Sequence, residues 1–444
     1  MQTKTTGHTK RTAAHIKDDI FRLTEEFYLE KFVKTKFIPG ETHVPISGKV
    51  FDHIELQYLI DSSLDGCFTT GRFNDQFETD LAKFINVRNV TTVNSGSSAN
   101  LLATASLFAD ELGERKIQSG DEVITVAVSF PTTLNAWLMY GVTPVFVDVD
   151  IPTYNIDVSK LEAAISEKTK AIMLAHTLGN PFNIEAVKKF ALKHKLWLIE
   201  DCCDALGSTY NGKHVGTFGD VATLSFYPAH HITMGEGGAI YANNPKLVKI
   251  IKSIRDWGRD CWCDPGKDNT CGKRFNWQLG DLPHGYDHKY IYSHLGYNLK
   301  ITDMQAALGL AQLKKLPGFI QRRKRNFSLL SEGLSNLQNK IYLPEATENS
   351  DPSWFGFLIT LKDGAGITRN ELIFKLTEKK IATRLLFGGD IRKQPYFVNQ
   401  KYRTIGELKN TETILRNTFW IGVTPMITDE MAHYVTESFQ EILG

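Results

Sequence analysis

Short apolar runs alternate with amphipathic segments through the middle of the chain. Four runs of aliphatic and β-branched residues predict strands at 121–126, 143–149, 171–176 and 196–201. Helical spacing of apolar residues predicts helices over Phe77–Ile85, after Asn94, and over Ile184–His194. Apolar strands separated by amphipathic helices predict an α/β fold with a mostly parallel sheet covered on both faces. Ligands bind such sheets at the carboxyl ends of the strands, where Asn94, Asp148 and Asp201 lie.

The pattern differs toward the amino terminus. In an N-terminal extension, residues 1–60, four apolar residues recur at helical spacing: Ile16, Ile20, Leu23 and Phe27. They predict an amphipathic helix that docks on the main body or contacts a second subunit.

The second half of the chain contains an irregular stretch between two helical patterns. Residues 257–297 are rich in Gly, Asp, His, Cys and Trp, and they show no usable periodicity. The stretch is too long for an ordinary connection, so we expect a functional insertion in a large domain that spans 61–316. Helical spacing resumes over Thr302–Leu316, and a smaller C-terminal α/β domain is expected over 317–444.

Composition narrows the choice of function. A chain of 444 residues exceeds the usual size of a single core, which agrees with two domains. The formal charge of +1 gives no broad field for nucleic acid or anionic membranes. No apolar run approaches the roughly 20 residues that span a bilayer, and the first residues are polar. We therefore expect a cytoplasmic protein that binds neither nucleic acid nor membrane, with its cysteines reduced.

Two strand ends carry candidate ligand-binding groups. Asn94–Asn100 reads Asn-Ser-Gly-Ser-Ser-Ala-Asn, in which Gly96 permits close backbone approach and Ser97 offers a hydroxyl. Amides at a helix start can hold a phosphate, although such a sequence is equally often a simple turn and helix cap. Asp201 ends the last strand, and a pyridinium nitrogen needs such a carboxylate to keep its proton. A structural role for Asp201 is the alternative.

A third segment gives these motifs a common context. Ser225–Gly238 reads Ser-Phe, then four residues, then His230, and ends in Gly-Glu-Gly-Gly. The order of the three motifs resembles the fold-type I sugar aminotransferases of the DegT/DnrJ/EryC1/StrS family, which act on nucleotide-linked keto-sugars. The resemblance extends from about Phe68 to the carboxyl terminus and includes Gly296–Ala307.

His230 is a departure from the family pattern. The family's lysine, which forms a Schiff base with pyridoxal phosphate, should stand at this position, and no lysine lies between Lys213 and Lys246. Imidazole cannot form that bond, so ordinary transamination is disfavoured. A histidine can instead transfer a proton near neutral pH. The alternatives are an inactive enzyme or a histidine that only packs in the core.

The cysteines form a second unusual pattern, Cys203-x57-Cys261-x-Cys263-x7-Cys271. Four thiolates suit a structural zinc ion or an iron–sulfur cluster, and the spacing alone does not decide between them. The Cys-x-Cys pair is tighter than the usual zinc-knuckle spacing, which favours iron. Cys67 and Cys202 have no assigned role beyond small buried residues.

Histidine in place of lysine, together with these cysteines, resembles the branch of the family that dehydrates CDP-4-keto-6-deoxyglucose at carbon 3. That resemblance implies pyridoxamine phosphate (PMP/PLP) as cofactor, a [2Fe–2S] cluster, a flavin iron–sulfur reductase fed by NADH, and a homodimer in lipopolysaccharide synthesis. It implies His230 as the base and Asp201 on the cofactor ring nitrogen. The remaining cofactor contacts are expected from Gly96, Ser97, Phe130 and Ser225, and from Asn298 of the partner subunit.

Two rival functions stay open at this level. One is a histidine-bearing 3-dehydratase without a cluster, which takes its amine from glutamate. The other is a non-catalytic sugar-binding relative stabilised by zinc. The sequence does not identify the nucleotide, the stereochemistry of the sugar or the reductase.

Overall fold

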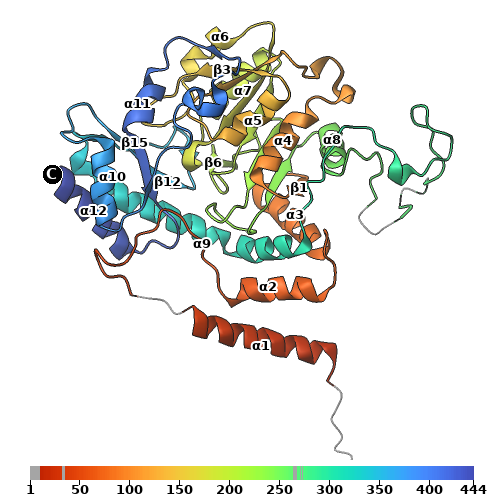
Figure 1. Ribbon diagram of the computed structural model, residues 1–444, viewed down its shortest axis with the longest axis horizontal. Coiled ribbons are helices and arrows are strands. Elements are labelled where there is room, and N and C mark those ends of the chain that lie inside the picture. Colours follow the sequence, from red (N-terminus) through yellow and green to blue (C-terminus); the bar gives the residue numbers. More distant parts are fainter. Residues whose placement is uncertain (1–10, 33–35, 264–267, 271, 273) are drawn as a thin grey trace, which may run out of the picture.

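The computed structural model describes residues 11–32, 36–263, 268–270, 272 and 274–444. A sheet covered by helices forms its centre (Figure 1). The sheet has eight strands, in the order β1-β9-β8-β5-β4-β2-β3-β14. Its strands are β1 Val90–Val93, β2 Glu122–Val126, β3 Thr143–Val147, β4 Thr169–Ala175, β5 Trp197–Asp201, β8 Val221–Ser225, β9 Gly238–Tyr241 and β14 Arg403–Thr404. All neighbouring strands are parallel except β9, which is antiparallel to both β1 and β8. The predicted, mostly parallel sheet is therefore present.

Helices cover both faces of this sheet, because successive strand residues point to opposite sides. Val123 packs with one apolar cluster and Ile124 with the other. The first cluster includes residues of α4 Gly96–Ser106, α5 Pro131–Met139 and α8 Pro245–Arg255. The second includes residues of α3 Arg72–Ile85, α6 Leu161–Ala164, α7 Ile184–Lys193 and α9 Asp303–Gly333. The predicted strands and helices of this region are confirmed to within a few residues.

A second, antiparallel sheet of four strands lies toward the carboxyl terminus, in the order β10-β12-β15-β13. Its strands are β10 Ile341–Tyr342, β12 Gly356–Leu361, β13 Thr383–Arg384 and β15 Thr418–Gly422. The accompanying helices are α10 Arg369–Glu378, α11 Lys409–Asn417 and α12 Asp429–Leu443. A small third sheet joins β6 Thr209–Tyr210, β7 Lys213–His214 and β11 Ser350–Asp351.

The predicted end of the helix at Leu316 is wrong. Helix α9 continues through Pro317 to Gly333. A proline inside a helix removes one backbone hydrogen bond, but Ile320, Asn326 and Leu330 are buried along the continuation. Their burial offsets the lost bond, so the helix connects the two larger sheets without a break.

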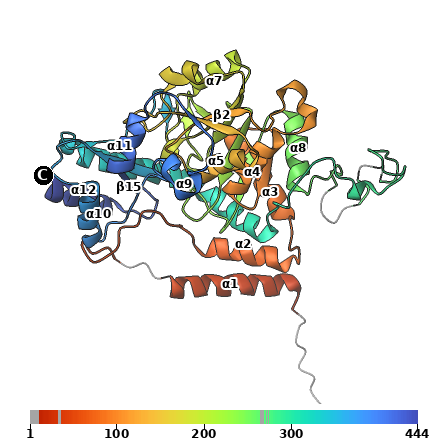
Figure 2. The same cartoon turned by 45° about the horizontal axis from the view of Figure 1, so that its top comes forward.

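The amino-terminal helix forms as predicted, but it packs through a different side. Helix α1 Ala13–Lys31 lies along α2 His53–Leu64 (Figures 1 and 2). The Tyr28 hydroxyl donates to the Phe51 carbonyl, and the Gln57 amide donates to the Phe21 carbonyl. Three of the four residues in the predicted apolar stripe remain exposed, with 54% exposure at Leu23 and 59% at Phe27, whereas Ile20 is half-buried.

The stretch 257–297 contains one short 3-10 helix, His288–Tyr290, among its described residues. It projects from the body beside α8 (Figures 1 and 2). Arg274 and Asp287 form a two-bond ion pair within it, at 3.0 and 2.6 Å. No helix in the described part of the chain has the length and apolar character needed to cross a bilayer.

Asp303 joins the beginnings of α3 and α9. Its buried carboxylate accepts hydrogen bonds from the backbone amides of Gly71 at 2.9 Å and Asn74 at 2.8 Å. These amides lie at the first turn of α3, where backbone donors lack partners within the helix and Gly71 supplies no side-chain cap.

Replacing Asp303 with alanine should leave these donors buried without an acceptor. We expect Asp303→Ala to lower the free energy of unfolding by about 2–3 kcal/mol, measured from denaturant unfolding curves. Asp363→Ala, at an exposed loop position, is the control. Equal curves for the two variants would contradict the capping role.

Candidate functional site

A cavity of about 550 Å³ lies between the carboxyl edge of the large sheet and the four-stranded sheet. Strands β1, β5 and β8 end at the same edge, so residues from distant parts of the chain meet there. The predicted residues that line this cavity are Gly96, Ser97, Phe130, Asp201, Cys203, Ser225 and His230. The site therefore assembles most of the candidates that the sequence singled out.

The loop after β1 forms a tight cradle at the start of α4. Ser95 caps this helix, and its hydroxyl accepts a hydrogen bond from the amide of Ser98 at 3.0 Å. A Cβ atom at Gly96 would lie 2.5 Å from the Cβ atom of Ser225, so no larger residue fits. Hydroxyls of Ser97 and Ser225 line the same wall. Amides and hydroxyls at a helix start suit a phosphate group.

Asp201 is held by three donors at the end of β5. Its Oδ2 atom accepts from the Asn100 side-chain amide at 2.9 Å and from the Thr133 hydroxyl at 2.7 Å. Its Oδ1 atom accepts from the backbone amide of Cys203 at 3.1 Å. The Thr223 hydroxyl in turn donates to the Asn100 side chain at 2.7 Å and fixes its orientation. This carboxylate, 4% exposed, suits a buried cationic partner such as a ring nitrogen.

His230 lines the cavity beside Asp204, a largely buried acid that the sequence motifs did not indicate. Its Nδ1 atom lies 3.3 Å from an Oδ atom of Asp204, an ion-pair contact whose angle is not that of a hydrogen bond. Burial raises the pKa of Asp204, while His230 opposes the rise. The ring of Phe355 stacks on the His230 imidazole at 5.3 Å between centroids. With Nδ1 turned toward Asp204, Nε2 is the atom available as a base.

A buried cation supports the backbone behind His230. Arg323, 1% exposed, comes from α9 and donates to the carbonyls of Trp354, Phe355 and His230 at 3.2–3.4 Å. Burial lowers its pKa to about 10, and nearby Asp204 raises it. Arg323 and Phe355 were missed because their contacts depend on elements that lie far apart in the sequence. Asp204 stands three residues after Asp201, and that proximity was the one available signal.

The cysteines do not assemble into one site within the described residues. Cys203 lines the central cavity, whereas Cys261 and Cys263 line a separate small cavity on the stretch 257–297. Cys271 lies outside the described residues. Cys202 is buried, as predicted from its residue type, whereas the same prediction for Cys67 is wrong, because Cys67 is partly exposed near Thr70. The four-cysteine site stays a prediction.

Two further candidates lie at the edge of the site or away from it. Phe130 lines the cavity and is half exposed. Its ring meets the ring of Phe387 edge-on, with the two ring centroids 6.0 Å apart. Asn298 is exposed outside the cavity and accepts a hydrogen bond from Lys300 at 2.8 Å. Its expected contribution to a partner's site stays a prediction.

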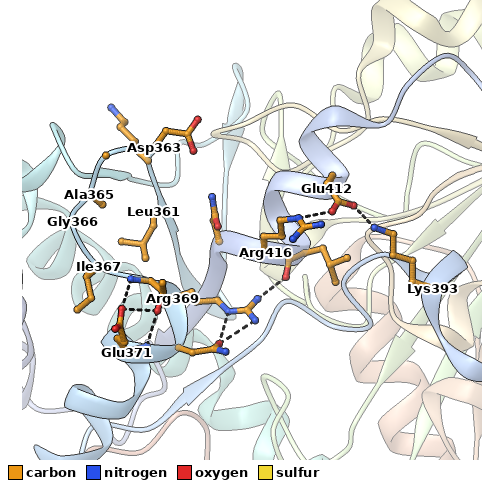
Figure 3. A pocket seen from close by; sticks show the side chains of 16 residues that line it. Leu361, Asp363, Ala365, Gly366, Ile367, Arg369, Glu371, Lys393, Glu412 and Arg416 are labelled. Atoms are coloured by element: carbon orange, nitrogen blue, oxygen red, sulfur yellow. Dashed lines mark hydrogen bonds and ion pairs between the residues drawn. The ribbon is translucent and has the colours of Figure 1, made fainter.

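A larger surface hollow of about 870 Å³ lies elsewhere, between the loop before α10 and helix α11 (Figure 3). Its arginines already have partners: Arg416 pairs with Glu412 at 2.6 Å, and Arg369 donates to the Leu415 carbonyl at 2.6 Å. The Glu371 carboxylate caps the start of α10. None of the predicted site residues lines this hollow, so it does not compete with the central cavity.

Comparison with known proteins agrees with this geometry. Residues 51–440 match the model of the DegT/DnrJ/EryC1/StrS aminotransferase family. The chain is 60% identical to the lipopolysaccharide biosynthesis protein RfbH of Salmonella typhimurium strain LT2, over 98% of this chain and 99% of that protein. It is 51% identical to dTDP-4-dehydro-2,6-dideoxy-D-glucose 3-dehydratase of Saccharopolyspora spinosa, over 96% and 92% of the two chains.

A solved structure gives the corresponding match in three dimensions. GDP-4-keto-6-deoxymannose-3-dehydratase with a trapped PLP-glutamate geminal diamine is 30% identical, with a TM-score of 0.79. The match covers 89% of this chain and 99% of that chain. The predicted fold, that of fold-type I pyridoxal-phosphate enzymes, is thereby confirmed.

The neighbour of His230 supplies a test of the electrostatics of the site. His231 is 3% exposed, and its Nε2 atom lies 2.8 Å from the Ser353 carbonyl oxygen. Burial lowers the pKa of His231, so the folded protein holds this ring neutral. An unfolded histidine takes up a proton near pH 6.5, so acid favours the unfolded chain.

We therefore expect stability to fall as the pH decreases through about 6.5, the unfolded pKa of histidine. His231→Gln keeps a donor for Ser353 but has no titrating group, so its thermal midpoint should fall less between pH 7 and 5. Exposed His433→Gln is the matched control and should follow the parent. Identical pH dependence in all three proteins would overturn this assignment.

Proposed function

We propose a function from one premise: this chain belongs to the DegT/DnrJ/EryC1/StrS aminotransferase family. It is a pyridoxal-phosphate-dependent enzyme of sugar modification that removes the 3-hydroxyl of a nucleotide-linked 4-keto-6-deoxyhexose. The observation that carries this proposal is His230, which lies in the cavity where the family pattern calls for a lysine. Two of the compared relatives are named as 3-dehydratases, which supports the same reaction.

The cavity residues fit the expected cofactor. The cradle of Gly96, Ser97 and Ser225 would hold its phosphate, because the missing Cβ atom at Gly96 lets the start of α4 lie against Ser225. Asp201 would keep the ring nitrogen protonated, and Phe130 would cover one ring face. When bound, pyridoxamine phosphate supplies an amine that condenses with a keto group and a ring that withdraws electrons.

His230 performs the proton transfers in this proposal. Its Nε2 atom removes a proton from the methylene carbon beside the amine and returns it to the hydroxyl that leaves carbon 3 as water. Asp204 faces the opposite ring nitrogen at 3.3 Å and stabilises the imidazolium that forms between the two transfers. Phe355 restricts rotation of the ring by stacking on it.

The proposed substrate is a class of compounds, the nucleotide-linked 4-keto-6-deoxyhexoses. The names of the relatives contain dTDP and GDP, so the predicted CDP-4-keto-6-deoxy-D-glucose is one candidate among several nucleotide sugars. The relative that is 60% identical is named for lipopolysaccharide biosynthesis, which supports a role in supplying a dideoxysugar to that polymer.

Replacing a hydroxyl by hydrogen requires two electrons. Their source is either an amino acid or an iron–sulfur cluster. The adduct in the solved relative contains glutamate, which favours an amino acid that recharges the cofactor. The alternative is the predicted [2Fe–2S] cluster, fed by a flavin iron–sulfur reductase. The described residues do not fit that cluster, because Cys203 lies apart from Cys261 and Cys263. The cluster, the reductase and the homodimer stay predictions.

His230→Lys tests the proposed base. A lysine side chain can anchor pyridoxal phosphate covalently, so we expect water loss from 4-keto-6-deoxyhexose nucleotides to fall by at least about 100-fold. Mass spectrometry of the sugar nucleotide measures this loss under anaerobic conditions. His433→Lys is the control at an exposed position. Dehydration at the parent rate in His230→Lys would remove His230 from the mechanism.

Metal analysis separates the two electron sources. Protein purified without oxygen is assayed for iron, acid-labile sulfide and zinc, together with a visible spectrum. Iron with sulfide, lost in Cys263→Ser, would establish the cluster. Absence of both, with turnover that depends on added glutamate, would establish the amino-acid route. Zinc without dehydration would favour a non-catalytic relative and overturn the proposed function.

A further inference from the structure

The central cavity has an unbalanced set of charges. Among its described lining residues, three carry carboxylates, Asp201, Asp204 and Glu236, and one, Arg384, carries the guanidinium of an arginine. A ligand with two or more negative charges would be repelled by the carboxylates unless a cation receives it. Arg384 is therefore the one permanent cation among the described lining residues that could receive such a ligand.

Arg384 comes from the second sheet, on the wall opposite the phosphate cradle. It lies on β13, where it pairs with Trp420 of β15. The neighbouring pair, Thr383 with Ile421, points to the other face, where Ile421 packs in the core of the small domain. This alternation places Arg384 and Trp420 together on the face that lines the cavity.

The guanidinium has unused donors. Its one hydrogen bond in the described structure goes to the carbonyl of its neighbour Thr383, at 2.8 Å. No carboxylate of the described chain forms an ion pair with Arg384. An arginine has five N–H donors, whose planar arrangement matches two oxygens of a phosphate.

The segment that carries Arg384 is held firmly. The indole N–H of Trp420 donates to the Leu385 carbonyl at 3.2 Å, and Phe387 contacts Phe130 across the cavity. The cofactor phosphate already has its own cradle on the large sheet, at Gly96 and Ser225. A cation on the opposite wall is consequently available for a second anionic group.

We infer that Arg384 binds the diphosphate of the sugar nucleotide and so places the sugar ring between the cofactor and His230. This inference rests on the proposed function, because it assumes a nucleotide-linked substrate. A carboxylate of an amino-acid donor has the same chemistry for a guanidinium, and the experiment distinguishes the two.

Calorimetry measures binding of CDP, dTDP, GDP and, separately, glutamate to the full chain loaded with the cofactor. Loss of one charge-assisted bidentate contact should weaken binding of the preferred nucleoside diphosphate by about 10- to 100-fold in Arg384→Gln. Arg384→Lys keeps the charge and should lose less affinity. The difference between parent and Arg384→Gln should shrink at high salt.

Arg416→Gln is the matched control, because Arg416 is an exposed arginine outside the cavity. Unchanged nucleotide affinity in Arg384→Gln, or weakening of glutamate alone, would overturn the assignment. The failure of the proposed function gives a different result: nucleotides bind through Arg384, but the sugar nucleotide loses no water. A raised KM with little change in kcat would further mark Arg384 as a binding residue.

Discussion

The hydrogen bonds around Asp201 are the interaction on which the rest of the site depends. Its carboxylate accepts from Asn100 in the second turn of α4 and from Thr133 in the first turn of α5. Thr223 of β8 orients Asn100, so this carboxylate connects two strands and two helices. A buried carboxylate is costly unless it is fully bonded, and its donors are therefore fixed in place. The phosphate cradle and the aromatic wall take their positions from the same helix starts.

The second half of the site is added by the small sheet and by α9. Arg323, Phe355 and Arg384 come from this part of the chain, whereas His230 belongs to the loop after β8. The unbroken passage of α9 through Pro317 is what brings Arg323 beneath the His230 backbone. The site is thus a joint product of two packed units, and its ligand selectivity depends on both.

The cysteine-bearing stretch raises a different kind of question. Cys261 and Cys263 lie on a segment that projects from the body, while Cys203 lies beside Asp201 inside the cavity. Burial and the Asp201 carboxylate raise the pKa of the Cys203 thiol, so this side chain is a neutral thiol when no metal is bound. The electron source in the proposed reaction therefore depends on the metal that the protein binds.

Sequence by itself determined the parallel sheet, its covering helices and most cavity residues. The spacing of apolar residues and the residue that ends a strand are both local properties of the sequence. His230 and Asp201 were identifiable for the same reason, each standing in a short motif. Tertiary structure alone decided that Asp204 faces His230, that α1 leaves most of its apolar stripe exposed, and that Arg384 lines the cavity. Those outcomes depend on contacts between segments that lie far apart in the sequence. The local spacing of residues does not specify such contacts.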